Sequence, residues 1–148
     1  MNELKSRLLA GKLILYSAIL AFFGFLDSFY LTLLHYKNII PPCSLHFGCE
    51  KVLTSAFSMI GPIPMALLGV VFYLTVIIVC LLIVIENMKQ LLKFFHFAVV
   101  VGFLVSVVLF FIQFWILQSF CQYCLLSEVI STGLLFLSLL KIKEDKAR

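Results

Sequence analysis

The residue pair best suited to chemistry in this 148-residue sequence is Cys121 and Cys124, which are separated by two residues. The pair begins an apolar stretch of helical length. Free N–H groups and the positive end of the dipole at a helix N-terminus stabilise a thiolate, and the thiolate is the reactive species in thiol–disulfide exchange. A disulfide across two residues closes too short a loop to stabilise a fold strongly. We therefore expect a redox-active pair rather than a structural one.

A second pair, Cys43 and Cys49, lies in the loop that follows the first apolar stretch. Four cysteines allow three disulfide connectivities, and the sequence does not choose among them. The loop pair is either a structural disulfide or a second dithiol that exchanges with Cys121 through a mixed disulfide. In the second case Cys121 and Cys124 pass the electrons onward. At lipid depth, a lipid-soluble quinone is the obvious acceptor of two electrons.

Metal binding is the competing interpretation of the same residues. The segment from Cys43 through His46 to Cys49 has ligand-like spacing, and together with the pair at positions 121 and 124 it could supply a zinc shell. However, thiols outside the cytoplasm are held as disulfides rather than as free thiolates. We therefore expect no metal at these cysteines.

The composition places the cysteines in a membrane protein. The chain is 64% hydrophobic and only 12% charged, whereas soluble domains carry about 25% charged residues. A helix crosses a bilayer with roughly 20 apolar residues, and four stretches qualify: residues 13–36, 65–85, 94–118 and 121–142. Strands are excluded because no stretch alternates and lipid tolerates no open sheet edge. We predict an all-α integral membrane protein, a four-transmembrane-helix bundle, in one domain over residues 1–148.

The distribution of basic residues predicts the orientation of this bundle. Nine of the 11 lysines and arginines fall on one side: Lys5, Arg7, Lys12, Lys89, Lys93, Lys141, Lys143, Lys146 and Arg148. Short basic segments stay in the cytoplasm. Both termini are therefore expected inside, in a multi-pass inner (plasma) membrane protein, with the outer loop 37–64 and the paired cysteines outside. The net charge of +4 forms no basic cluster, so no nucleic-acid partner is expected.

Two further features follow from the same patterning. Apolar residues in the segment 50–60 recur at helical spacing, which predicts a short amphipathic helix lying on the membrane surface over the bundle. Gly61 and Pro62 end that helix, and Pro64 is suited to begin the second span. The fifth cysteine, Cys80, lies near the inner end of the second span and is interpreted as a small buried apolar residue.

Together these residues resemble the vitamin K epoxide reductase family in its bacterial, single-module form. The resemblance covers essentially the whole chain, at residues 27–32, His35, Cys43, residues 48–50, Ser55, residues 63–64, residues 68–69 and the Cys-Gln-Tyr-Cys of residues 121–124. The loop pair comes first and the Cys-x-x-Cys pair lies on the last helix. The DsbB family, which is similar in plan, places its Cys-x-x-Cys in the first outer loop and does not match.

The resemblance implies a bundle that holds a quinone of menaquinone, ubiquinone or vitamin K type beside Cys124. Electrons would arrive through the loop cysteines from a thioredoxin-like, DsbA-like protein outside the cytoplasm, in support of disulfide formation in exported proteins. Only a short tail, residues 141–148, follows the fourth stretch, so we expect this partner to be a separate chain. Animal relatives reduce vitamin K quinone and its epoxide in the endoplasmic reticulum. Glu128 in place of their tyrosine and Met65 in place of their asparagine weigh against that alternative.

Residue roles also follow from the resemblance. We expect catalysis to use Cys43, Cys49, Cys121, Cys124 and Ser55, although Ser55 is equally interpretable as a hydroxyl on an amphipathic helix. We expect quinone contacts from Cys124, Phe114, Met65 and Glu128. Aromatic residues Trp115 and Tyr123 fit an interfacial belt as well as a quinone wall.

Asp27 is a carboxyl inside the first span, and such groups usually face the bundle interior or water. We expect it to be packed and hydrogen-bonded, with a proton route to the quinone as the alternative. The predicted activity is that of a thiol–quinone oxidoreductase. The partner's dithiol reduces the loop pair, the loop pair attacks Cys121, and Cys124 passes two electrons to the quinone. A non-enzymatic membrane protein that binds metal or carries structural disulfides is the alternative from a different class.

Overall fold

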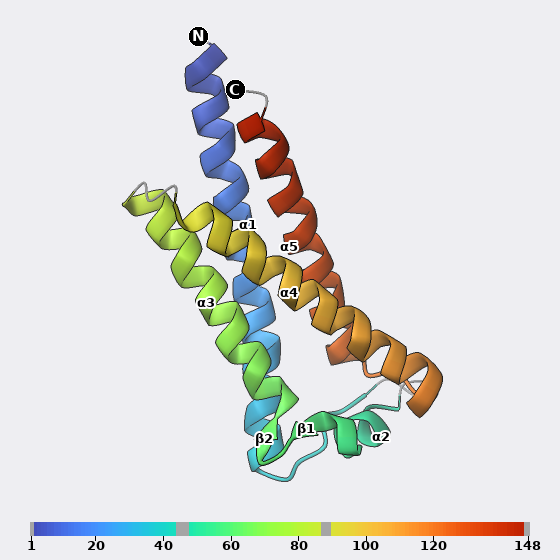
Figure 1. The fold of residues 1–148 in the computed structure, drawn as a ribbon. Helices are drawn as coiled ribbons and strands as arrows, with labels where there is room; N and C mark the ends of the chain where they lie inside the picture. The colour runs from blue at the N-terminus through green and yellow to red at the C-terminus, as the bar shows by residue number, and fades with distance from the viewer. Residues whose placement is uncertain (1, 44–47, 87–89, 147–148) are drawn as a thin grey trace.

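Residues 2–43, 48–86 and 90–146 are described by a computed structural model (Figure 1). Within them, four helices are long and apolar enough to cross a membrane, which confirms the predicted bundle. They are α1 (Asn2–Tyr36), α3 (Met65–Ile85), α4 (Leu91–Phe111) and α5 (Gln122–Lys146). The predicted bounds 65–85 match α3. Helix α1 begins well before residue 13, because only the part of a helix that crosses lipid has to be apolar.

The third span ends differently from the uniform helix that its apolar sequence predicts. After Phe111, α4 continues as a π-helix, η2 (Ile112–Leu117), which stops at Gln118 in the left-handed conformation with φ 48°. The Ser119 N–H donates to the Gln113 carbonyl over 3.2 Å and closes this end. A π turn shifts the side chains that follow it around the helix axis, and such turns are frequent at functional sites.

The segment between α1 and α3 contains the predicted short helix, but the helix is shorter than expected. It is α2 (Cys49–Leu53), followed by a 3₁₀ turn, η1 (Ala56–Ser58), and a hairpin of β1 (Met59–Ile60) and β2 (Ile63–Pro64). The predicted continuation to residue 60 is wrong. The hydroxyls of Thr54 and Ser55 donate to the carbonyls of Glu50 and Val52, each over 2.7 Å, and such bonds compete with helical backbone pairing.

Helix α1 packs against α3 and α5, and small residues set how closely the helices approach. A Cβ added at Gly24 would lie 2.5 Å from the Tyr73 ring, and one at Gly69 would lie 2.6 Å from the Ser28 hydroxyl. The Tyr73 hydroxyl in turn lies 2.8 Å from the Ser127 hydroxyl on α5. These contacts hold α1, α3 and α5 in a fixed register around the bundle interior.

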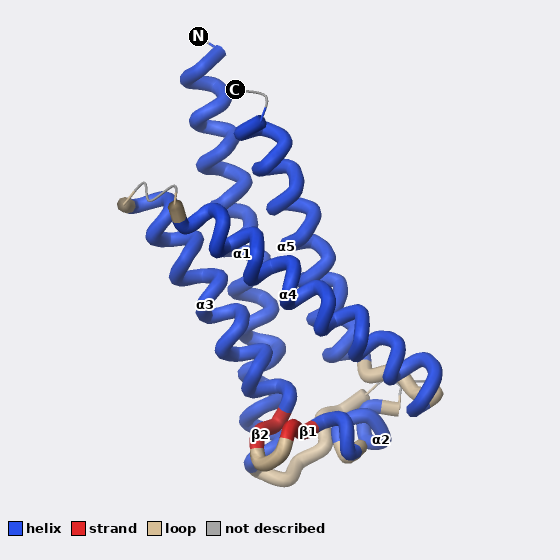
Figure 2. The backbone as a smooth tube through the Cα atoms, in the orientation of Figure 1, coloured by secondary structure: helices blue, strands red, loops and turns tan. Residues whose placement is uncertain are grey.

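The two ends of the bundle differ in what they carry. Both termini lie at one end, and the loop with α2 and the short hairpin covers the other (Figures 1 and 2). Both halves of the Cys-x-x-Cys motif lie at the loop end, because α5 starts directly after Cys121. Cys80 is fully buried in the bundle core, as predicted. The fold therefore brings four of the five cysteines to the same end.

Candidate functional site

Cys121 occupies the N-terminal boundary of α5. Its carbonyl accepts a hydrogen bond from the Leu125 N–H over 2.9 Å, and its Sγ accepts one from the Cys124 N–H over 3.4 Å. The Cys121 side chain is 0% exposed. A hydrogen bond from the Cys124 thiol lowers the pKa of the Cys121 thiol below its ordinary value, against the opposing effect of burial. The start of the helix therefore favours a thiolate at Cys121.

The loop pair is oxidised. Cys43 and Cys49 form a disulfide with their Cα atoms 6.2 Å apart, whereas Cys80, Cys121 and Cys124 are free thiols. This is one of the three connectivities that the sequence left open. Sulfurs joined in a disulfide do not serve as thiolate ligands. His46 lies outside the described residues, and no three His, Cys, Asp or Glu side chains within those residues are grouped to hold a metal ion.

The loop disulfide is held against the Cys-x-x-Cys motif from both sides. Before Cys43, the Pro42 carbonyl accepts a hydrogen bond from the Tyr123 hydroxyl over 3.1 Å. Before Cys49, Gly48 lies so close to the turn preceding α5 that an added Cβ would be 2.8 Å from the Ser119 Cβ.

The result of this docking is a small hydrophobic cluster around the sulfurs. Its buried members are Cys49, Val52 and Cys121, with Cys43 and Cys124 packed against them. The fold thus gathers both cysteine pairs in one cluster. That proximity is what exchange between them requires.

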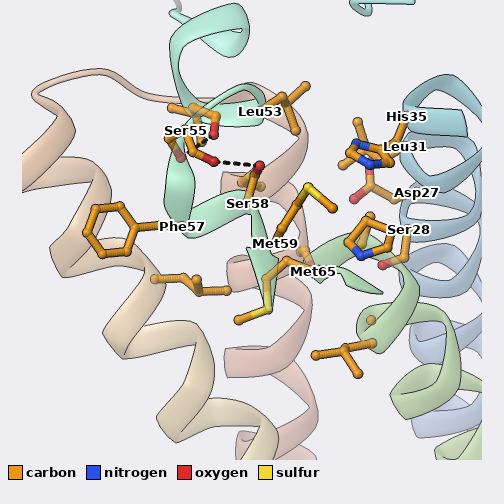
Figure 3. Close-up of a pocket in the computed structure, with 18 of the residues that line it drawn as sticks. Asp27, Ser28, Leu31, His35, Leu53, Ser55, Phe57, Ser58, Met59 and Met65 are labelled. Atoms are coloured by element: carbon orange, nitrogen blue, oxygen red, sulfur yellow. Dashed lines mark hydrogen bonds between the residues drawn. The ribbon is translucent and has the colours of Figure 1, made fainter. Parts of the chain in front are cut away.

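A cavity of about 660 Å³ opens beside the second cysteine of the motif. In Figure 3, Asp27, Ser28, Leu31 and His35 of α1 line one side, Ser55, Phe57 and Met59 of the loop lie across from them, and Met65 projects from the start of α3. Cys124, Ser127 and Glu128 of α5 also line the cavity. Cys121 is not one of the described lining residues, so the two thiols of the motif have different surroundings.

A buried amide links the motif to the cavity wall. Gln113 is 3% exposed and lies in the π-helix η2. Its Oε1 accepts a hydrogen bond from the Cys121 N–H over 2.9 Å, and its Nε2 donates to Glu128 Oε1 over 2.7 Å. Because a backbone N–H only donates, it fixes which end of the amide faces Cys121. Gln113 therefore presents its NH₂ group to Glu128 and holds that carboxyl beside Cys124.

The residues expected around a quinone fall into two groups. Met65, Cys124 and Glu128 line the cavity, and so does Ser55. Phe114 is not among the described lining residues; it is 51% exposed and stacks on Phe110 outside the cavity.

Trp115 and Tyr123, which fit either an interfacial belt or a quinone wall, are also not among the described residues that line the cavity. Trp115 is exposed and stacks on Phe111. Tyr123 holds the loop, through Pro42, rather than lining the cavity.

Sequence reasoning missed Gln113 and Tyr73. Gln113 carried a usable signal, because an uncharged polar residue inside an apolar span usually faces the protein interior. Gly48 was part of the family resemblance, but its contact with Ser119, 71 residues further along the chain, was not predictable. Tyr73 is one aromatic residue among many in the spans, and only the packing distinguishes it.

Comparison with curated proteins gives no match. The family model described as "Vitamin K epoxide reductase family" matches residues 15–139, which include all five cysteines. Because the matched residues make up most of the chain, this protein belongs to the vitamin K epoxide reductase family, whose members are membrane oxidoreductases of thiol–disulfide and quinone chemistry.

Proposed function

We propose that this protein reoxidises a separate thioredoxin-like partner and passes the electrons to a lipid-soluble quinone, in support of disulfide formation in exported proteins. The observation that carries the proposal is the position of the two cysteine pairs. The oxidised pair Cys43–Cys49 packs in one cluster with Cys121, and Cys124 lines a cavity of about 660 Å³.

The electron path follows from this arrangement. A thiolate of the partner attacks the Cys43–Cys49 disulfide, and the partner's second thiol resolves the mixed disulfide, leaving the loop pair reduced. A loop thiolate then attacks Cys121 in its disulfide with Cys124, and Cys124 leaves as a thiolate. When the loop disulfide re-forms, the motif is a dithiol. The Cys43–Cys49 disulfide and the free Cys121 and Cys124 thiols support this path.

The cavity fits a quinone in size and in chemistry. Small-molecule sites measure about 300–1,000 Å³ and combine apolar walls with a few polar groups. Here Met65, Leu68 and Phe72 supply apolar surface, while Cys124 and Glu128 supply polar atoms at one wall. When bound, a quinone supplies an acceptor for two electrons and two protons. Phe114 lies outside this lining, so we do not include it among the residues that hold the quinone.

Ser55 supports the loop pair from a distance. Its hydroxyl donates to the Val52 carbonyl over 2.7 Å, and its carbonyl accepts from the Ser58 hydroxyl. These bonds end α2, the short helix that begins with Cys49. We assign Ser55 as a positioning residue for Cys49.

Anaerobic assay of the purified protein tests this function. With a reduced thioredoxin-like donor and a short-chain ubiquinone, the wild type should oxidise the donor and produce quinol in equal amounts. Cys121→Ala and Cys124→Ala should reduce no quinone with any thiol donor, and Cys43→Ala or Cys49→Ala should lose turnover with the protein donor. Cys80→Ala is the matched control and should keep wild-type activity. Thiol-dependent quinol formation that survives Cys124→Ala would refute the proposal.

The same preparation separates the alternatives. Reduction of vitamin K epoxide with no turnover of a protein donor would favour the reductase alternative. A protein that forms no quinol under any of these conditions would favour a structural role for both pairs.

A further inference from the structure

Asp27 is a buried carboxyl that the electron path does not use. It lies within the membrane-crossing part of α1 and is 8% exposed. The carboxyl is packed as expected, but its Oδ2 has no hydrogen-bond partner among the described residues. A carboxyl held this way is costly, and such residues in membrane spans usually mark a functional path.

The fold keeps Asp27 facing the cavity. Its neighbour Ser28 lies against Gly69, and Gly24, one turn earlier, lies against the Tyr73 ring. These contacts set the rotation of α1 against α3. Figure 3 shows Asp27 and Ser28 on the cavity wall formed by α1, below Leu31 and His35.

The cavity presents other titratable groups to Asp27 from different helices. They are His35 on α1, Tyr73 on α3, and Cys124 and Glu128 on α5. Two of them already have partners: Glu128 accepts from Gln113, and the Tyr73 hydroxyl contacts Ser127 and Ser131. Asp27 also lines the cavity, its Oδ2 has no partner among the described residues, and it stands on a different helix from Cys124.

We propose that Asp27 is an acid of the quinone site, whose carboxyl donates a proton to a carbonyl oxygen of the bound quinone. The proposal rests on the function proposed above. A quinone carbonyl only accepts hydrogen bonds, so a protonated carboxyl is a matching partner. The carboxylate left after the transfer accepts from the new hydroxyl. The free oxygen of Asp27 thus has a hydrogen-bond partner with both the quinone and the quinol.

The step balances within the site. Oxidation of Cys121 and Cys124 forms one S–S bond and releases two electrons and two protons. Conversion of a quinone to its quinol consumes the same two electrons and two protons. Asp27 delivers one of these protons to oxygen and is reprotonated by one that the thiols release. No further oxidant or reductant is needed.

The test compares Asp27→Asn with the wild type in a single turnover of the pre-reduced protein with a short-chain ubiquinone. General acids contribute about 10²–10⁴-fold to rates. We expect thiol oxidation in Asp27→Asn to slow by about 100-fold, and Asp27→Glu to recover at least part of that loss. Ser17→Ala is the control, because Ser17 is a buried polar residue of α1 that does not line the cavity, and its hydroxyl donates to the Leu13 carbonyl. It should react at the wild-type rate.

A second readout does not depend on turnover. Infrared difference spectra on binding a redox-inactive quinone analogue should show a protonated-carboxyl band that shifts in the wild type and in Ser17→Ala. The band should be missing in Asp27→Asn, while the affinity for the analogue changes by less than about threefold.

Three results would show that Asp27 is not an acid of the quinone site. An unchanged single-turnover rate in Asp27→Asn, or the same carboxyl band without Asp27, would overturn the inference. A tenfold or greater loss of analogue affinity with lower thermal stability would identify Asp27 as a structural residue and would also overturn it. A wild type that reduces no quinone would instead refute the proposed function, and the inference with it.

Discussion

Replacing Gly48 with alanine should separate the loop disulfide from the motif that it serves. Gly48 precedes Cys49 and has φ −94° and ψ 49°, so its backbone does not require glycine. The obstacle to a side chain is Ser119, since an added Cβ would lie 2.8 Å from the Ser119 Cβ and 3.0 Å from its hydroxyl. Any effect of the added methyl group therefore comes from the contact between the loop and the turn before Cys121.

The size of the effect follows from this clash. Ordinary contacts between such atoms are about 3.5–4.0 Å, so either the loop or the turn has to move. Overpacking of this kind costs about 1–3 kcal/mol. The equilibrium constant for docking of the loop then falls by a factor of about 5 to 150. If the docked loop is the form that exchanges with Cys121, turnover with a protein donor should fall by up to this factor.

Two measurements should respond in opposite directions. Quinol formation driven by a reduced thioredoxin-like donor should slow in Gly48→Ala. Alkylation of Cys121 by a small maleimide in the reduced protein should become faster, because that side chain is 0% exposed under the docked loop. Gly11→Ala is the matched control, since an added Cβ at Gly11 meets no described atom within 4 Å.

A compensating change at Ser119 tests whether the clash causes the loss of turnover. Ser119→Gly removes the atoms that the new methyl group would strike, so the double variant should regain most of the lost turnover and again protect Cys121. A Gly48→Ala protein with wild-type turnover and wild-type protection would show that docking of the loop does not control exchange. Loss of turnover that Ser119→Gly does not restore would show that the clash is not its cause.

Three further predictions test the orientation, the relay and the thiolate. Reporter fusions should be of cytoplasmic type at Arg148 and of periplasmic type within residues 45–54, and the opposite result would overturn the inference from the basic residues. Removing Cys124 together with one loop cysteine should trap a mixed disulfide between Cys121 and the remaining loop cysteine in one of the two possible variants. Non-reducing mass spectrometry would detect the linked peptides. Free thiols in both variants would show that the loop pair is only a structural disulfide. In Gly48→Ala, the alkylation rate of Cys121 should reach half its maximum at a pH below about 8.5, the pKa of an ordinary cysteine, because the Cys124 thiol lowers the pKa of Cys121. Adding Cys124→Ala should raise the pH of half-maximal alkylation. If that pH does not change, the Cys124 thiol is not the cause of the lowered pKa.

The four membrane spans were predictable because each depends on a long run of apolar residues in the sequence. A span needs roughly 20 apolar residues wherever it packs, so α3 could be located from hydropathy alone. With four spans, the loop after the first span and the start of the fourth span lie on the same side of the membrane, so the grouping of four cysteines at one end was also predictable. Which face of each helix is buried was not predictable in the same way. The amide of Gln113 marked one inward-facing position of the third span, but the aromatic and aliphatic residues around it gave no sign that Phe114 is exposed.

The loop illustrates a second limit of sequence reasoning. Its apolar spacing predicted one helix, and the sequence signals against that helix were the short hydroxyl residues Thr54 and Ser55. Whether such residues bond to their own backbone is decided by the folded chain. Asp27 is similar. Its presence in a span marked it as unusual, but only the fold shows that its Oδ2 is buried without a partner among the residues that the structure describes.

The spacing of the motif explains how one helix turn can serve two reactions. Cys121 is buried against Cys49 and Val52, whereas Cys124 lines the cavity. A thiol that faces the loop is suited to exchange with a disulfide, and a thiol that faces the cavity is suited to a small lipophilic acceptor. Because Cys121 is buried under the loop, the Cys43–Cys49 pair is the route by which a protein donor reaches it in the proposed path. In the proposed path, this cover directs electrons from a protein donor to the quinone and keeps unrelated thiols from short-circuiting the relay.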